Sequence, residues 1–141
     1  MARQRPQSAP SSSTTLSKLL NQTQLQFELD FFANILVRNP SFVEALKIHA
    51  KNLAMEHRHE EGLQYDRRIA GLRPDDSLAH YNLACSFALT RQPNEALDSL
   101  RKAVELGYRD FKYMKQDRDL ELIRKDPRFR SLLREYDPNH H

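Results

Sequence analysis

The chain has little of what a β-rich or disulfide-bonded protein needs. Its 141 residues include three glycines and no tryptophan, and aromatic residues make up 9%. So few glycines and aromatics argue against a β-rich fold, which requires more turns. Cys85 is the only cysteine, which excludes an intrachain disulfide bond and is compatible with a reducing compartment. Because Cys85 lies in an apolar helical pattern, we expect it to be a small helix residue rather than a nucleophile.

Long apolar runs are also missing. The best run, residues 31–37, is interrupted by Asn34 and followed by Arg38. A membrane-spanning helix needs roughly 20 predominantly apolar residues, and this run is much shorter. We therefore expect no membrane partner.

Motifs that support catalysis or cofactor binding are absent from the sequence. It has no glycine-rich phosphate loop, no Gly-x-Ser-x-Gly and no His-Glu-x-x-His. No nucleophile is paired with a base in a recognisable arrangement. We expect no enzymatic activity, no catalytic residues, no cofactor and no small-molecule substrate.

The net charge of +3 is distributed unevenly. Residues 1–27 hold three basic groups and no acidic one, so residues 28–141 hold 19 of each. A neutral folded part weakens a nucleic-acid interpretation of the basic net charge. Residues 101–134 hold eleven basic and six acidic groups, but these are interleaved as on an exposed helix face. We expect no nucleic-acid partner.

Residues 1–15 are predicted to form a disordered basic tail. Pro6, Pro10 and the serine run at 11–13 leave almost nothing apolar to bury. An acid-free start with arginine and serine also resembles an organellar transit peptide. The expected localisation is cytoplasmic, with import into an organelle as the alternative.

From residue 16 onward the apolar residues follow helical spacing. Leu16, Leu19 and Leu20 stand at i, i+3 and i+4, and a second run covers residues 27–38. Further segments with helical spacing are predicted at about 43–57, 60–72, 77–90, 93–106, 110–115, 117–124 and 127–135.

Capping signals mark several of these boundaries. Ser41 and Glu44 form a capping-box signature, in which the hydroxyl and the carboxylate satisfy opposite sides of one helix start. Other cap and stop signals are Asp75-Asp76-Ser77, Pro93, Gly107 and Asp126-Pro127.

Residue types recur 34 positions apart, which is the spacing of a helix–turn–helix solenoid unit. The pairs are Pro40 and Pro74, Ala50 and Ala84, Leu53 and Phe87, Gly62 and Ala96, Ile69 and Ala103, and Leu72 and Leu106. One helix pair cannot bury its own apolar faces, so such pairs stack. Small residues are needed where the stacked helices approach closely, and we expect this role for Ala50, Gly62, Ala84 and Ala96.

The best-formed unit is residues 77–110, SLAHYNLACSFALTRQPNEALDSLRKAVELGYRD. On its small residue Ala84, its aromatic Phe87 and its later alanine Ala103, the chain resembles tetratricopeptide repeat proteins. The Asn-Glu-Ala-Leu at 94–97 matches the opening of the family's second helix. The unit departs from the family pattern in that His80 replaces Trp, Ala84 replaces Gly, and Tyr108 stands where Pro is frequent.

The resemblance implies an all-α fold, a short right-handed α-solenoid of antiparallel helix pairs with terminal capping helices. The predicted domain, residues 16–136, consists of a half repeat at 27–40, repeats at 43–76 and 77–110, and a C-terminal cap at 111–136. The cap looks like a closing segment that follows such repeats in many bacterial proteins. Residues 137–141 are expected to fray.

In the family, the first helix of each pair lines a concave groove. The register places there Lys47, Lys51, Met55, Leu78, Tyr81, Asn82, Cys85 and Leu89, continued by Lys112 and Lys115. Some members grip the terminal carboxylates of an acidic peptide with Lys, Asn and Arg side chains from three repeats. The residues that match those positions here are Lys47, Asn82 and Lys112. At the other two positions, Lys51 stands in place of Asn and Gln116 in place of Arg. The candidate peptide-binding residues are Lys47, Lys51, Tyr81, Asn82 and Lys112.

One inter-helix turn holds metal-ligand residue types: His57, His59, Glu60 and Glu61. Histidine and carboxylate can bind metal ions, but the four are adjacent with no second cluster. A solvated turn explains them better, so no metal site is predicted.

These features favour a protein–protein interaction module that binds a peptide or a partner protein in the concave groove. An acidic C-terminal peptide would suit the basic residues there, and a merely solvated basic face is the alternative. The rival function is an accessory subunit of a larger assembly, held through its outer or terminal helices.

Overall fold

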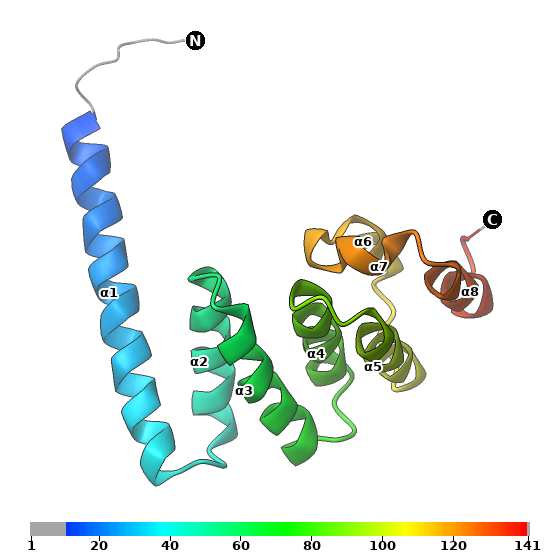
Figure 1. Ribbon diagram of the computed structural model, residues 1–141, viewed down its shortest axis with the longest axis horizontal. Helices are drawn as coiled ribbons and strands as arrows, with labels where there is room; N and C mark the ends of the chain where they lie inside the picture. Colours follow the sequence, from blue (N-terminus) through cyan, green and yellow to red (C-terminus); the bar gives the residue numbers. More distant parts are fainter. Residues whose placement is uncertain (1–10, 141) are drawn as a thin grey trace.

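The computed structural model describes the backbone of residues 11–140 and the side chains of residues 15–140 (Figure 1). Its elements are α1 (Ser11–Arg38), α2 (Val43–Met55), α3 (His59–Leu72), α4 (Ser77–Leu89), α5 (Pro93–Glu105), α6 (Phe111–Gln116), the 3-10 turn η1 (Arg118–Leu120), α7 (Glu121–Arg124) and α8 (Pro127–Tyr136). Within the described residues there is no strand, and no helix combines the length and apolar character needed to cross a membrane.

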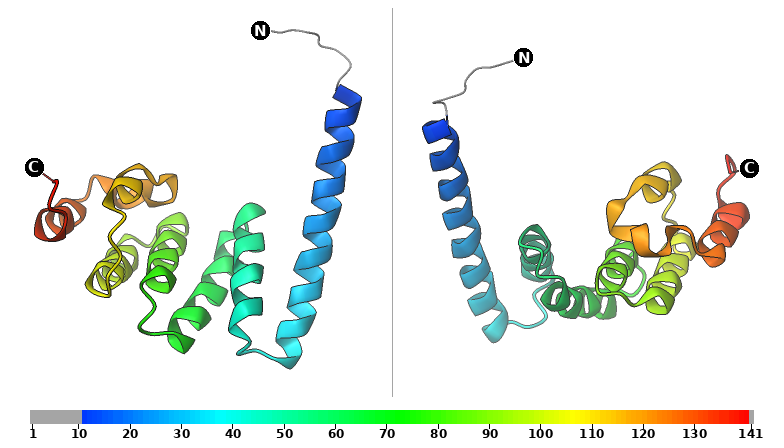
Figure 2. Two further views of the ribbon diagram at one scale, coloured as in Figure 1. Left: turned by 180° about the vertical axis from the view of Figure 1, so that it is seen from behind. Right: turned by 45° about the horizontal axis from the view of Figure 1, so that its top comes forward.

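The long helices lie side by side in the order of the sequence and alternate in direction (Figures 1 and 2). α2 pairs with α3, α4 pairs with α5, and α3 packs on α4 to join the two pairs. The prediction of an all-α repeat built from antiparallel helix pairs is confirmed.

The buried apolar residues form two clusters. The first joins the end of α1 to α2, α3 and the start of α4, through Leu36, Ala45, Leu46, Ala50, Ile69 and Ala79. The second joins α4 and α5 to the C-terminal helices, and in it Ala84 and Ala96 have no exposed surface. The predicted position of these two alanines inside the helix stack is confirmed.

The two glycines that the sequence singled out differ in what they do. A Cβ added at Gly62 would lie 3.9 Å from the Leu53 Cβ, which is an ordinary contact. Alanine would fit at this buried position, so the approach of the helices does not require glycine, and the expectation of a small residue is not contradicted. Gly107 has a φ of 117°, in the left-handed region that side chains avoid, and it ends α5 as predicted.

Helix starts follow the predicted caps with one exception. The Asp76 carboxylate accepts hydrogen bonds from the Leu78 and Ala79 amides at 3.0 and 3.3 Å. Pro93 occupies the first turn of α5, and Asp126 caps α8. The capping box at Ser41 is wrong, because the N-cap of α2 is Phe42 and has no side-chain cap bond. A turn, closed by the Phe42 amide on the Asn39 carbonyl oxygen, holds Ser41 outside the helix.

α1 differs most from the sequence prediction. The runs at 16–20 and 27–38 belong to one helix of 28 residues, which projects beyond α2 (Figure 1). Residues 11–38 contain neither glycine nor proline to interrupt it. The side chains of Gln24 and Gln26 also donate to Glu28 and Asp30, one turn further on. The predicted tail 1–15 therefore ends earlier, since the helix includes residues 11–15, while residues 1–10 lie outside the described residues.

α6, η1, α7 and α8 pack over the end of the second helix pair. η1 and α7 contact α4, and α7 and α8 contact α5. At the end of α8, the buried Asp137 pairs with Lys115 Nζ at 2.9 Å and accepts from the Asn139 amide. The expectation of fraying from residue 137 onward is wrong at Asp137, because these contacts hold it.

Candidate peptide-binding groove

A groove of about 550 Å³ runs along one side of the helix pairs. α2, α3 and α4 form most of its wall, and Tyr108, Tyr113 and the residues around η1 close one end. Its floor is largely apolar and includes Ala50, Gly62 and Ile69. An apolar cavity with a few polar groups is the usual form of a ligand site in a folded protein.

Most of the predicted groove residues line this cavity. Lys47 and Lys51 reach it from α2, and Tyr81 and Asn82 reach it from α4. The neighbouring Leu78, Cys85 and Leu89 line it too, whereas Met55 does not. The 34-residue register and the structure therefore agree on the side of these two helices that faces the groove.

Lys112 is not part of the groove. Phe111 and Met114 occupy the buried face of α6, so Lys112 lies on its exposed side. It lines a separate hollow together with Lys115 and Asp137. The period of 34 stops at Gly107, and extending it to α6 placed this lysine on the wrong face. The predicted three-repeat arrangement for an acidic peptide is therefore not assembled in one cavity.

Tyr81 links the second helix pair to the C-terminal segment. Its hydroxyl donates to Asp117 Oδ2 at 2.7 Å, and its ring stacks on Tyr108 with centroids 4.2 Å apart. Burial, followed by the hydrogen bond to Asp117, raises the pKa of Tyr81. The phenol stays protonated as a donor, and the residue has a structural role besides lining the groove.

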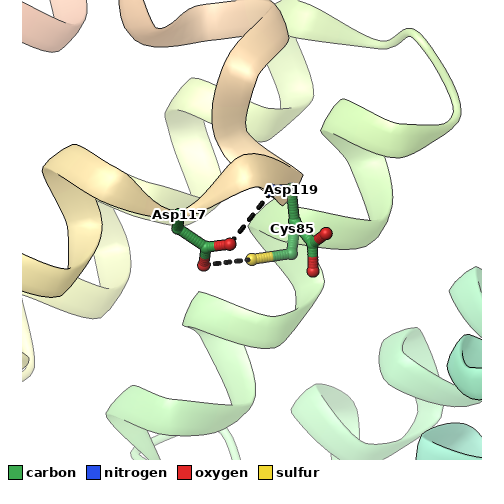
Figure 3. Close-up of side chains that lie close together, drawn as sticks. All are labelled: Cys85, Asp117 and Asp119. Carbon is green, nitrogen blue, oxygen red and sulfur yellow. Dashed lines mark hydrogen bonds between the residues drawn. The ribbon is translucent and has the colours of Figure 1, made fainter. Parts of the chain in front are cut away.

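Asp117 is the residue that sequence reasoning missed. Its Oδ1 accepts from the Asp119 amide at 3.0 Å and so caps η1, and its Oδ2 accepts from the Cys85 thiol (Figure 3). The same Oδ2 also accepts from the Tyr81 hydroxyl. In the sequence, Asp117 is only the first residue of a segment with helical spacing, at about 117–124. The signal for its second role, a buried tyrosine 36 positions earlier, cannot be read from periodicity.

Cys85, Asp117 and Asp119 are the only group of metal-ligand types found together in the described part of the chain. Their ligand atoms lie within 4.8 Å of one another, and Figure 3 shows the three side chains converging. However, both Asp117 oxygens already accept hydrogen bonds. Burial, helped by the nearby carboxylates, raises the pKa of Cys85, so its thiol stays protonated. The internal hydrogen bonds account for the cluster without a metal ion.

Four aspartates give the groove more acidic character than the sequence suggested: Asp66, Asp76, Asp117 and Asp119. Asp76 lies 3.9 Å from Lys47 Nζ. Asp66 accepts a hydrogen bond from the Ser86 hydroxyl, and burial raises its pKa to about 6. Burial and the neighbouring Asp117 also raise the pKa of Asp119.

Comparison with solved structures supports the fold. A chain named MamA RS-1 ArsTM double mutant, of tetratricopeptide type, superposes with a TM-score of 0.58 and 19% identity, over 86% of this chain and 72% of that one. The fold is tetratricopeptide-like. At this level of identity the likeness shows the fold alone.

Comparison of sequences finds a curated relative in Arabidopsis thaliana, a protein whose name describes it as chloroplastic. The two chains are 36% identical over 83 residues, which is 57% of this chain. The chain spans 25% of that protein's length. No family model matches the chain.

Proposed function

We propose that this tetratricopeptide-like chain is a protein–protein interaction module that binds an extended segment of a partner in the groove. The supporting observation is the cavity of about 550 Å³, lined by α2, α3 and α4 with an apolar floor and charged ends. Successive helix pairs in a solenoid create extended concave surfaces of this kind. Because fold does not determine function, the proposal rests on the groove and not on the fold.

Blocking the groove tests this proposal. Leu78 and Asn82 are exposed on α4 and line the cavity, so Leu78→Arg with Asn82→Arg fills it without disturbing the core. The matched control is Asp98→Arg with Glu105→Arg, at exposed positions of α5 outside the groove. Affinity capture from the native host, followed by calorimetry with the purified partner, should show binding by wild type and control only. A partner retained by the groove variant would contradict the proposal.

An exposed apolar stripe on α1 favours the rival function, a subunit held through a terminal helix. The stripe consists of five residues whose exposed fraction lies between 48% for Phe31 and 62% for Phe27. They are Leu16, Leu19, Leu20, Phe27 and Phe31. Their spacing places them on one side of the helix, away from the Leu29 and Leu36 side that is buried. Contiguous exposed apolar surface of this kind is typical of interaction sites.

Light scattering after size exclusion discriminates between the two functions. A stable oligomer that becomes monomeric in Leu20→Gln with Phe27→Gln supports the assembly function. A monomer that captures its partner equally well with or without these substitutions supports the groove.

We further propose an organelle as the working compartment. The support is the name of the relative, which assigns that protein to the chloroplast, together with the acid-free basic start of this chain. Imaging the full chain and an Arg3→Glu, Arg5→Glu variant, each fused at the C-terminus to a fluorescent protein, tests this. Cytosolic signal from both fusions would favour the cytoplasmic alternative.

A further inference from the structure

The two ends of the groove differ in charge. Lys47 and Lys51 lie at the α2 end. Asp66 from α3 and the pair Asp117 and Asp119 around η1 lie toward the other end. The ligand atoms of Asp117, Asp119 and Cys85 lie within 4.8 Å of one another, and Asp66 accepts from Ser86, the next residue of α4, so the three carboxylates surround one point on α4. The groove is therefore polarised along its length.

The carboxylates at the negative end of the groove are not paired with Lys or Arg side chains of the described residues. Among residues 15–140, no Lys or Arg forms an ion pair with Asp66, Asp117 or Asp119, whereas Asp76 at the positive end has Lys47. His57, in the turn before α3, and His59, the first residue of α3, lie near Asp119. They lower the pKa of Asp119 by less than burial raises it. Hydrogen bonds satisfy Asp117 and Asp66 internally, but Asp119 is exposed, so its carboxylate can meet a cation that a ligand brings.

Aromatic rings surround the same end. Tyr81 and Tyr108 are stacked, and the Tyr113 ring centroid lies 6.3 Å from that of Tyr81. Tyr113 is 52% exposed and lines the groove, so its ring is open to a ligand. Tyrosine faces attract ammonium and guanidinium groups, and carboxylates bind the same groups through charge-assisted hydrogen bonds.

We propose that this end of the groove, between Tyr113 and Asp119, receives an arginine or lysine side chain of the bound partner segment. The inference rests on the proposed function, since it names the chemistry of the segment that the groove binds. Acidic residues of the same segment lie toward Lys47 and Lys51, so the charge pattern fixes the direction in which the segment binds. The expected ligand is thus basic at one end and acidic at the other, and not uniformly acidic as the sequence suggested.

A peptide library with one fixed residue tests the charge preference. The probes are acetylated, fluorescein-labelled octapeptide sublibraries whose fixed position is Arg, Lys, norleucine or Glu, and the readout is fluorescence anisotropy with the full chain. We expect the Arg and Lys sublibraries to bind about tenfold more tightly than norleucine, and Glu to bind no better than norleucine. Equal affinity for Arg and norleucine, or a preference for Glu, would overturn the proposal.

Two substitutions locate the effect. Asp119→Asn removes a groove charge while its backbone amide still donates to Asp117, and Glu121→Gln is the matched control at an exposed position outside the groove. We expect Asp119→Asn to reduce the preference for Arg over norleucine at least threefold and Glu121→Gln to leave it unchanged. A preference equally strong in Asp119→Asn would refute this location.

The outcomes also separate this proposal from the function on which it rests. If every sublibrary binds alike and the Leu78→Arg with Asn82→Arg variant abolishes that binding, the groove function stands and the cation subsite fails. If no sublibrary binds, or if binding persists in the blocked variant, the groove function fails and the subsite with it.

Discussion

At the scale of single residues, the molecule depends on a few buried polar contacts between segments that are distant in sequence. Asp117 accepts hydrogen bonds from Tyr81 and Cys85 on α4 and from the Asp119 amide in its own turn. A buried carboxylate is tolerated when its oxygens are hydrogen-bonded in this way. These contacts position the wall of the groove as well as the C-terminal segment.

The Tyr81 hydroxyl contributes measurably to this connection. Tyr81→Phe keeps the ring stacked on Tyr108 but removes the donor to Asp117 Oδ2, so we expect the free energy of unfolding to fall by about 1–3 kcal/mol. Urea denaturation measures the change. Tyr113→Phe is the control, because Tyr113 is 52% exposed and should cost less than about 0.5 kcal/mol. Equal effects of the two substitutions would contradict the assigned role of the hydroxyl.

Asp66 makes stability depend on pH. Burial raises its pKa to about 6 from an ordinary value of 3.8, so its ionised form is disfavoured in the folded state. The contribution of Asp66 to the free energy of unfolding is therefore most favourable below its unfolded-state pKa and is lost as pH rises through about 6. At pH 7.5, Asp66→Asn should gain up to about 3 kcal/mol and still accept from the Ser86 hydroxyl.

The measurement that checks this is urea denaturation at pH 7.5 and pH 4. The gain from Asp66→Asn should shrink at pH 4, where the carboxyl is protonated in the folded protein. Asp98→Asn, at an exposed position of α5, should show little change at either pH. A gain of the same size at both values would exclude burial of the charge as its cause.

At the scale of helices and turns, the sequence predicts what local chemistry determines and fails where tertiary packing decides. Asp76 and Gly107 are visible as caps because a carboxylate and a left-handed residue act on their own turn. The Ser41 signature failed because the preceding turn placed Phe42 at the N-cap. Lys112 was misplaced because the burial of Phe111 and Met114, and not the repeat period, sets the face of α6.

Gly62 in α3 offers a substitution that tests helix propensity separately from the packing of α3 against α2. Gly62 lies in the first turns of α3 with room for a Cβ 3.9 Å from Leu53, so Gly62→Ala should stabilise the protein by about 0.5–1 kcal/mol. Gly107→Ala is the contrasting control. Its φ of 117° strains any side chain, and we expect it to destabilise by about 1 kcal/mol or more. Thermal denaturation measures the stability of both variants. A loss of stability in Gly62→Ala would show that α3 packs more tightly against α2 than the distance to Leu53 indicates.

At the scale of the whole molecule, the two apolar clusters divide the stack into unequal parts. One cluster is mostly in α1, α2 and α3 and includes Ala79 of α4, and the other joins α4 and α5 to the C-terminal helices and includes Leu63 of α3. In a solenoid each unit contacts only its neighbours, so stability is close to a sum of unit and interface contributions. The packing of α3 on α4 is the main connection between the two parts. The groove crosses this connection, so its shape depends on how rigidly the parts are held together.

This arrangement predicts local rather than uniform loss of stability. Leu46 in the first cluster and Ile123 in the second have no exposed surface, and truncating either to alanine should cost about 2–5 kcal/mol. Amide hydrogen exchange should show Leu46→Ala accelerating exchange in α1 and α2 while α5 and α8 keep most of their protection. Ile123→Ala should do the reverse. Uniform acceleration across all helices in both variants would mean that the α3–α4 interface makes the stack a single cooperative unit. A ligand in the groove would then slow exchange in every helix, whereas with local unfolding it should slow exchange mainly in the helices that line the groove on both sides of that interface.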